Sequence, residues 1–512
     1  MTAAMLAVPT AAIAGDEVGV ATDQVQSTAT AQATPQIEAG AHLVVTRSGT
    51  EAGAESEAAE INQSGTPGLL GSNVTVKERV LTEAQADTLA RKSKITHIEP
   101  VLPIATQGSS LSADATASRA LVGPRPAASW GLDRVDQVTG LDGSYAPSSD
   151  GAGVHVYVID GNVASNHPEF AGRVGQGVSF VDAPTGGVCD RHGTHVAGTL
   201  MSSTYGVASG ATLHPVRILD CAGTGTSTGL LQGLIWVAEH HASIGAPPAV
   251  VNLSLGASAT SDVINDVIAQ LSDRGIVVAV AAGNQGAKAC DFSPASAPAA
   301  LTVAASTRYD AEANYSNWGR CLDIFAPGDG IASTNPDPQA VAASYMSGTS
   351  QAAPHVGGAA AVLWGNNLAQ SADDVRAGVA AMGRNGAISL IRPGVGSPNR
   401  LVAVPTSTAD GVAPVPSTNE QVLAKPGKVL KLRIKKLRKR TAVIKFRKVD
   451  LADRYRVEIR RAGTDKWRSR GQSKKSRLKV KRLRPDTVYL VRVIAKNQVG
   501  VTRGAKFKFR TR

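Results

Sequence analysis

The chain has 512 residues, with 53 lysines and arginines against 41 aspartates and glutamates, and only four cysteines. This length exceeds a single hydrophobic core and predicts about three domains, which excludes a small protein held together by disulfides. Residues 421–512 carry 33 basic and 5 acidic side chains, a net charge of +28, whereas residues 1–420 carry −16. The chain therefore joins two parts of opposite charge.

The N-terminus predicts a secretory signal at residues 1–14. Residues 3–14 are largely apolar, too few to span a bilayer, and end in Ala12, Ile13 and Ala14, which fit an A-x-A cleavage site. The usual positive charge is missing, so the signal is truncated or the segment is an alanine-rich leader. No other stretch reaches 18 apolar residues, so we expect a secreted, extracellular protein without a membrane span.

A small α+β unit is predicted over residues 38–106. Strand patterns at 41–46 and 95–106 flank an amphipathic helix at 82–93 that opens with a threonine cap. Small and polar residues with interspersed prolines then indicate a linker over 107–129.

Residues 130–404 predict a doubly wound α/β domain. Near-continuous apolar runs at 153–160, 211–219, 249–255 and 275–283 are typical of strands buried on both faces of a mostly parallel sheet. Helical segments such as 227–243 and 261–275 lie between them. The functional residues of such a fold are expected at the carboxyl ends of the strands.

Four polar residues follow these strands or open the next helices: Asp160, His192, Asn284 and Ser350. Each has an ordinary interpretation alone. Asp160 and Asn284 suit turns, Ser350 suits a helix cap, and His192 with His195 could bind a metal. Together they supply an orienting carboxylate, a general base, an oxyanion donor and a nucleophile for acyl transfer.

The order Asp, His, Asn, Ser resembles the subtilisin-like serine proteases. The matching segments are VID (158–160), HGTHVAGT (192–199), SLG (254–256), AAGN (281–284) and GTSQAAPHVGG (348–358). The resemblance implies that Ser350 is the nucleophile, that His192 takes its proton, that Asp160 orients His192, and that Asn284 donates to the oxyanion. Ser347 is expected in the preceding turn.

Two positions depart from the family pattern. Gly161 stands where Thr or Ser is usual, and Gln351 stands where Met is usual. Neither change removes a catalytic group, but each is expected to loosen the surrounding packing and to lower activity.

The resemblance also implies a secreted serine endopeptidase that binds extended peptides between two strands, 221–227 and 254–257. A broad specificity is expected, with apolar or aromatic residues favoured before the scissile bond. The expected substrate-binding residues are Gly223, Gly225, Ser254, Leu255, Gly256, Ala281, Ala282 and Gly283.

Four cysteines allow three pairings or free thiols. Their intervals resemble the proteinase K-like branch of the family, which implies the pairs Cys189–Cys221 and Cys290–Cys321. That branch also binds structural calcium, for which carboxylates are suitable ligands. The candidate ligands are Asp323 and, at a looser second site, Asp133, Asp136 and Asp142 with Gln137.

The unit at 38–106 resembles the ferredoxin-like inhibitory propeptide of these proteases. The resemblance implies a monomeric proenzyme whose own propeptide is its inhibitor. Its last strand, over residues 95–107, is expected to occupy the substrate cleft, and the cleavage is expected within 107–129.

A second linker at 405–421 leads to residues 422–512, where apolar and basic residues alternate as in β-strands. The segment 483–500 resembles fibronectin type III modules, which implies a β-sandwich. Its charge predicts binding to a polyanionic surface, although a solvated basic surface is the simpler alternative. The competing functional hypothesis is a catalytically weak or inactive protein that binds surfaces through this module.

Overall fold

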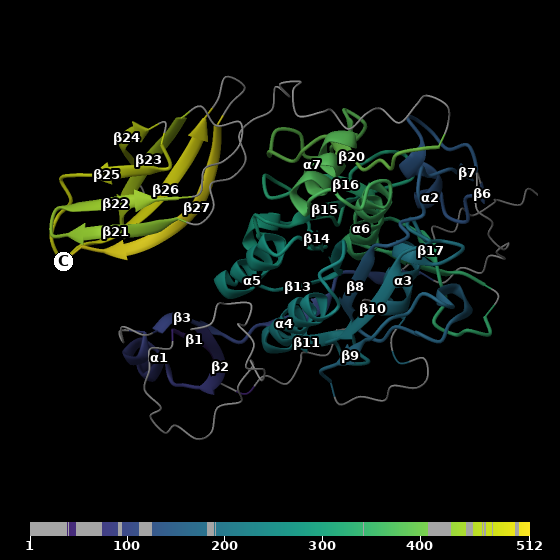
Figure 1. The fold of residues 1–512 in the computed structure, drawn as a ribbon, viewed down its shortest axis with the longest axis horizontal. Helices are drawn as coiled ribbons and strands as arrows, with labels where there is room; N and C mark the ends of the chain where they lie inside the picture. The colour runs from purple at the N-terminus through teal and green to yellow at the C-terminus, as the bar shows by residue number, and fades with distance from the viewer. Residues whose placement is uncertain are drawn as a thin grey trace, which may run out of the picture.

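The structure is a computed structural model (Figure 1). It describes residues 38, 40–47, 74–90, 95–111, 125–181, 189, 191–340, 342–407, 432–446, 454–462, 464, 467–473, 475–496 and 501–511. The predicted signal peptide and most of the linker at 405–421 lie outside these residues. Among the described helices, none is both long and apolar enough to cross a membrane.

A nine-stranded sheet forms the centre of residues 125–407, in the order β19-β20-β16-β15-β14-β12-β8-β10-β9. All neighbours pair in parallel except β19 and β20. After β8, the chain first adds β9 and β10 on one side of β8 and then adds β12 on the other side. The order of the strands therefore reverses at β8. Ligands bind at such a reversal, beyond the carboxyl ends of the strands. The strands are β8 (His155–Asp160), β9 (Val178–Ser179), β10 (Thr212–Arg217), β12 (Ala249–Leu253), β14 (Ile276–Ala281), β15 (Leu301–Ser306), β16 (Ile324–Pro327), β19 (Arg384–Asn385) and β20 (Arg400–Leu401).

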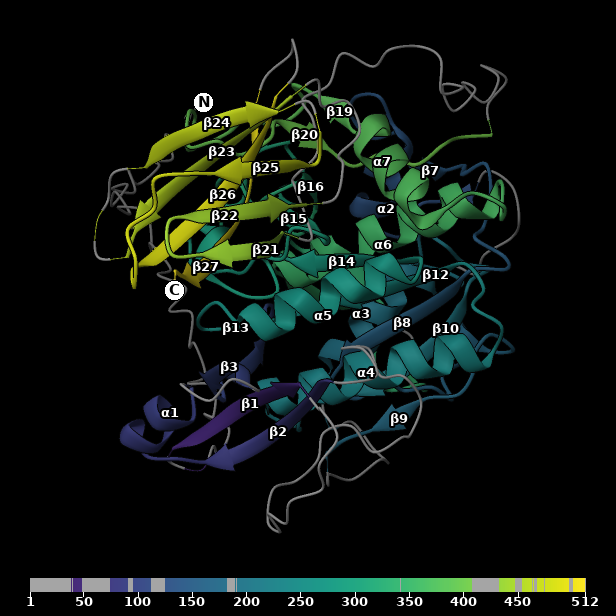
Figure 2. The same cartoon turned by 60° about the vertical axis from the view of Figure 1, so that its left-hand side comes forward.

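Helices cover both faces of this sheet, so its strands are apolar throughout, as predicted. One buried cluster joins the sheet to α2 (Trp130–Asp136), α3 (His192–Met201), α6 (Thr349–Gly365) and α7 (Ala372–Met382). A second cluster joins the other face to α4 (Ser227–Ser243) and α5 (Asp262–Asp273), which Figure 2 shows in front of the sheet. The doubly wound α/β fold is confirmed.

Three smaller sheets flank the central sheet. Two of them contain strands from the interval 103–111, β4 (Pro103–Thr106) and β5 (Ser109–Leu111). β4 lies between β11 (Thr224–Thr226) and β13 (Leu255–Ala257), and β5 pairs with β18 (Ser344–Ser347), which also pairs with β17 (Ile331–Ser333). The third sheet pairs β6 (Arg125–Pro126) with β7 (Ser144–Tyr145), and two short 3-10 helices span Pro168–Phe170 and Ala289–Asp291.

The N-terminal unit contains a three-stranded antiparallel sheet, β2-β1-β3, and one helix. The helix α1 (Glu83–Leu89) begins at the predicted cap, Thr82, with a complete capping box. Leu43, Val45 and Val76 are buried in the same cluster as α4 and α5, so the unit packs on that face of the central domain. Its strands are β1 (Ala41–Arg47), β2 (Val74–Val80) and β3 (Ile95–Pro100).

The C-terminal part contains two antiparallel sheets, of three and four strands, which share one buried cluster. The prediction of an all-β C-terminal unit is therefore confirmed. The first sheet holds β21 (Arg433–Arg438), β22 (Thr441–Lys445) and β25 (Arg477–Val480); the second holds β24 (Arg468–Ser473), β23 (Arg454–Arg461), β26 (Val488–Lys496) and β27 (Val501–Arg510).

Candidate active site

Asp160 and His192 form a buried pair beyond the carboxyl end of β8. Asp160 is the last residue of β8, and His192 is the first residue of α3. His192 Nδ1 lies 2.8 Å from Asp160 Oδ1, which also accepts the N–H of Gly161 at 2.6 Å. A carboxylate that holds one imidazole nitrogen leaves the other nitrogen available for proton transfer.

Ser350 is the second residue of α6 and is fully buried. The N-cap of this helix is Gly348, which has no side chain, so the interpretation of Ser350 as the helix cap is wrong. Ser350 Oγ donates to the Ser254 carbonyl at 2.8 Å. The prediction that Ser347 lies in a turn is also wrong: Ser347 ends β18, because residues 344–347 pair with β17 and β5.

Asn284 follows β14 and faces the start of α6. Its Oδ1 accepts both the N–H and the hydroxyl of Thr349 at 2.9 Å. This fixes the side-chain amide with Nδ2 directed at the carbonyl oxygen of Gln107, to which it donates. The backbone N–H of Ser350 donates to the same oxygen at 3.1 Å. Two donors therefore converge on one carbonyl, which is the arrangement of an oxyanion hole.

The segment around Gln107 lies in the site as an extended peptide. β4 pairs antiparallel with β11 on one side and with β13 on the other. Thr106 N–H donates to the Gly223 carbonyl at 3.1 Å, and Gln107 N–H donates to the Ser254 carbonyl at 3.3 Å. Of the eight predicted substrate-binding residues, Gly223, Gly225, Ser254, Leu255 and Gly256 flank this segment, and Ala281, Ala282 and Gly283 lie around the Gln107 side chain.

The Gln107 side chain lines a pocket whose other walls are mostly apolar. The walls include Gly256, Ala257, Ala281, Ala282, Phe292 and Ala295. Polar contacts are made at one end, where Gln107 Oε1 accepts from Gln285 Nε2 at 3.1 Å and from the Asn284 N–H at 3.3 Å. The peptide bond that lies beside Ser350 joins Gln107 to Gly108. We call Gln107 the P1 residue, Gly108 the P1′ residue, and the pocket around the P1 side chain S1.

Gln351 and His192 close the site around Gly108. A Cβ atom added to Gly108 would lie 2.9 Å from Gln351 Oε1 and 3.1 Å from His192 Nε2. Gln351 is fully buried, and its Oε1 has no hydrogen-bond partner among the described residues. Beyond Gly108, residues 109–111 pair with β18, and residues 112–124 of the predicted linker lie outside the described residues.

The other histidines near the site have structural roles. His195 Nε2 lies 2.9 Å from the Ile331 carbonyl, and burial lowers the pKa of His195 to about 3. His355 Nδ1 lies 2.7 Å from the Gln351 carbonyl, and burial lowers its pKa to about 4. Nothing in the described part of the chain supports a metal site at His192 and His195.

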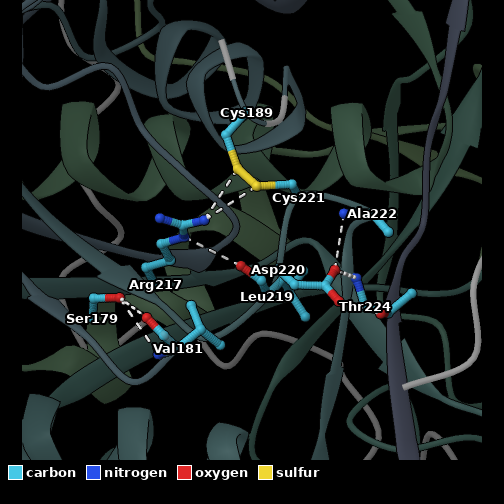
Figure 3. The surroundings of a disulfide bond; sticks show 9 residues. All are labelled: Ser179, Val181, Cys189, Arg217, Leu219, Asp220, Cys221, Ala222 and Thr224. Atoms are coloured by element: carbon cyan, nitrogen blue, oxygen red, sulfur yellow. Dashed lines mark hydrogen bonds between the residues drawn. A yellow bond between two sulfur atoms is a disulfide. The ribbon is translucent and has the colours of Figure 1, made fainter. Parts of the chain in front are cut away.

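The two implied disulfides, Cys189–Cys221 and Cys290–Cys321, are present in the structure. Arg217 donates to Cys189 Sγ at 3.1 Å, and Asp220 accepts from the N–H of Ala222 and of Thr224 at 2.9 Å (Figure 3). Thr224 begins β11, so this disulfide lies beside a strand that flanks the bound segment.

The four predicted calcium-binding carboxylates each accept a backbone N–H. Asp133 accepts the N–H groups of Asp142 and Gly143 at 3.0 Å. Burial, with a smaller contribution from the charge of Asp142, raises the pKa of Asp136 to about 6. Asp323 accepts the N–H of Thr302 at 3.0 Å, at the start of β16. In the residues described, no three His, Cys, Asp or Glu side chains are placed to hold a metal.

The comparisons with known proteins match the central domain. The sequence profile of the subtilase family (Peptidase_S8) matches residues 151–383. A solved structure of a cold adapted subtilisin-like serine proteinase is 38% identical, with a TM-score of 0.50, and the match covers 98% of that protein and 56% of this chain. The chain belongs to the subtilase family.

Two relatives extend the comparison of this subtilase. It is 49% identical over 238 residues to an extracellular serine proteinase of Thermus sp. (strain Rt41A), covering 46% of the chain and 56% of the relative. It is 40% identical over 296 residues to the alkaline serine exoprotease A of Vibrio alginolyticus, covering 57% of the chain and 52% of the relative. The chain thus spans about half the length of these relatives.

The sequence motifs did not point to two residues of this subtilase site, Gln285 and Asn317, nor to Gln107 as the P1 residue. Asn317 Nδ2 donates to Gln285 Oε1 at 2.9 Å, and Asn317 Oδ1 accepts the N–H of Ala287 at 2.8 Å. These residues lie in loops or beyond a strand, and no spacing in the sequence links them to the motif residues.

Proposed function

We propose that this subtilase is a serine endopeptidase that uses Asp160, His192 and Ser350 with Asn284. The observation that carries the proposal is the Gln107 carbonyl, which accepts from both Asn284 Nδ2 and the Ser350 N–H. Attack by Ser350 Oγ on this carbonyl carbon would place the developing negative charge between these two donors.

The proton movements follow from the Asp160–His192 pair. The hydroxyl proton of Ser350 turns from the Ser254 carbonyl to His192 Nε2 as Oγ bonds to the carbonyl carbon. Asp160, at 2.8 Å from Nδ1, stabilises the imidazolium. When the tetrahedral intermediate collapses, the carbonyl C–N bond breaks and His192 gives the proton to the leaving amine. Water then hydrolyses the acyl-enzyme by the same proton path.

The first substrate would be the chain itself, cut between Gln107 and Gly108 within the predicted interval 107–129. Residues 38–106 would then act as an inhibitor, because β4 keeps its pairing with β11 and β13. Two glutamates of this unit support retention. Glu78 accepts from Thr228 Oγ1 at the start of α4, and Glu99 accepts from Ser261 Oγ at the start of α5. Carboxylates are stabilised at helix N-termini.

Other substrates would bind as β4 does, through backbone hydrogen bonds to two strands, which supports broad sequence tolerance. The preference for apolar or aromatic P1 residues stays a prediction from the family resemblance. Secretion as an extracellular protein also stays a proposal, supported by the two disulfides and by the similarity to an extracellular serine proteinase. The monomeric state stays a prediction from the family resemblance.

The test uses a serine-directed fluorophosphonate and casein. The matured protein is expected to be labelled at Ser350 and to hydrolyse casein, and Ser350→Ala is expected to do neither. A matured wild-type protein that does neither would instead favour the surface-binding hypothesis.

Calcium is retained as a proposal from the family resemblance alone. Chelation is expected to lower the melting temperature of the Ser350→Ala protein, because an ion that binds only the folded form stabilises it. An unchanged melting curve with excess chelator would remove calcium from the account.

For the basic C-terminal unit we propose attachment to a polyanionic surface. Arg433 pairs with Lys445, and Lys445 pairs with Arg477, so three exposed cations form a row across β21, β22 and β25. Like charges directly opposite each other destabilise a sheet, and a polyanion would relieve this repulsion.

Replacing the three cations of this row by glutamine, in the Ser350→Ala chain, is expected to weaken retention on heparin. It is also expected to make the retention less dependent on salt concentration. Neutralising three exposed cations of the central domain, Lys288, Arg308 and Arg320, is the matched control. Equal retention of both variants would mean that the row is only a solvated surface.

A further inference from the structure

We infer that this site selects peptide bonds that join a glutamine to a glycine, with Gln285 reading the P1 side chain and Gln351 restricting the P1′ residue. This inference deepens the proposed endopeptidase function and rests on it. It differs from the preference for apolar or aromatic P1 residues that the family resemblance implies.

The S1 pocket presents hydrogen-bond donors to the P1 side chain. Asn317 fixes their direction: its Nδ2 donates to the Ala282 carbonyl and to Gln285 Oε1, both at 2.9 Å. With its oxygen held in this way, Gln285 turns Nε2 toward the substrate, at 3.1 Å from Gln107 Oε1. The N–H of Asn284 adds a second donor at 3.3 Å. A P1 side chain that carries an oxygen acceptor at the position of Gln107 Oε1 therefore receives two hydrogen bonds.

The other half of the P1 amide is matched as well. Gln107 Nε2 donates to the carbonyl of Ala105 at 3.2 Å, within the same peptide. A glutamate at P1 would place a carboxylate oxygen against this carbonyl oxygen, and two acceptors repel. Leucine or phenylalanine would contact the apolar walls but would leave both donors without a substrate partner. Glutamine is the side chain that satisfies both ends.

The P1′ restriction comes from the close approach at Gly108. A methyl group there would meet Gln351 Oε1 at 2.9 Å and His192 Nε2 at 3.1 Å, so one of these groups must shift. His192 is held by Asp160, and Gln351 is fully buried, with Nε2 at 3.7 Å from Met346 Sδ. Any P1′ side chain therefore displaces the proton-transfer group or a packed amide.

The experiment measures how fast the matured protein cleaves internally quenched peptides based on residues 103–111, PIATQGSSL. P1 is varied among Gln, Glu, Leu and Phe, and P1′ between Gly and Ala. We expect kcat/KM with Gln at P1 to exceed that with Leu or Phe about 5- to 10-fold, because Gln285 is exposed and water competes for its donor. Gly at P1′ is expected to exceed Ala by about 10-fold.

Two variants assign the selectivity to residues. Gln285→Leu is expected to abolish the advantage of Gln over Leu at P1, and Gln351→Ala to reduce the advantage of Gly over Ala at P1′. Because each result is a ratio within one protein, a general loss of activity cancels. Gln339→Leu, at an exposed glutamine outside the site, is the matched control and is expected to keep both ratios.

Equal or faster cleavage at Leu or Phe than at Gln would overturn the P1 assignment, and equal rates with Gly and Ala would overturn the P1′ assignment. Wild-type protein that hydrolyses casein and is labelled by fluorophosphonate, but shows flat ratios, refutes only this inference. Protein that fails in both of those assays refutes the proposed function itself.

Discussion

The backbone N–H of Ser350 donates to the carbonyl oxygen of Gln107 at 3.1 Å. Asn284 Nδ2 donates to the same oxygen, so the bond after Gln107 is polarised beside the expected nucleophile. The chain thus holds one of its own peptide bonds where the proposed reaction would take place.

Asn284→Ala is expected to lower kcat about 10²- to 10³-fold, because one of the two oxyanion donors is lost. Peptide hydrolysis by the matured variant measures the effect, with KM compared separately. Asn314→Ala, at an exposed asparagine outside the site, is the control. Full kcat in Asn284→Ala would show that the amide does not stabilise the transition state.

The free energy of unfolding is expected to fall as the pH is lowered from 6.5 toward 4. Burial lowers the pKa of His214 to about 4, as it does for His355, and lowers that of His195 to about 3. An unfolded histidine binds a proton near pH 6.5, whereas these folded rings stay neutral. As the pH falls through this range, the unfolded chain therefore binds more protons than the folded chain. Proton binding stabilises the unfolded chain, which lowers the free energy of unfolding.

Urea unfolding of Ser350→Ala at several pH values measures this dependence. His214 stacks between His155 and Tyr157, so His214→Phe keeps a ring in the stack but removes one titrating group. The slope of the unfolding free energy against pH measures the protons taken up on unfolding. In His214→Phe this uptake is expected to decrease by up to about one proton. An unchanged slope would exclude His214 as a contributor.

The fold was largely predictable from the sequence because its strands are buried on both faces. The run at 227–243 coincides with α4, and the capping box at Thr82 marks the start of α1. The four motif residues could be singled out as candidates, because each ends or follows a strand or lies at the start of a helix. Which residue lies at the nucleophile was not predictable, since the interval 107–111 has a linker composition and residues 109–111 become strand only by pairing with β18.

Glu99→Ala is expected to shorten the delay between chain cleavage and the appearance of peptidase activity. Glu99 accepts from Ser261 Oγ and from the N–H of Asp262, and its loss removes charge-assisted bonds worth about 1.5–3 kcal/mol. This corresponds to roughly 10- to 100-fold faster release of the N-terminal unit.

Mass spectrometry follows cleavage and a peptide substrate follows activity in the same sample. Glu83→Ala, at an exposed glutamate of α1, is the control and is expected to keep the delay. If Glu99→Ala and Glu83→Ala show the same delay, Glu99 does not retain the N-terminal unit.

Removing either disulfide is expected to lower stability by a similar amount. The pairs Cys189–Cys221 and Cys290–Cys321 close loops with sequence separations of 32 and 31 residues, and each contributes about 3–4 kcal/mol in the chain-entropy description. Thermal unfolding of the two double serine variants, each in the Ser350→Ala protein, measures this. A melting temperature equal to that of the parent would contradict a stabilising role.

The most direct test of the account is the N-terminal sequence of the matured protein produced in a host without other proteases. The wild-type chain is expected to yield a species beginning at Gly108 and a separate fragment ending at Gln107, and Ser350→Ala is expected to remain uncut. A wild-type N-terminus elsewhere would contradict the placement of Gln107 at the nucleophile. A Ser350→Ala chain cut at Gly108 would contradict cleavage by the proposed site.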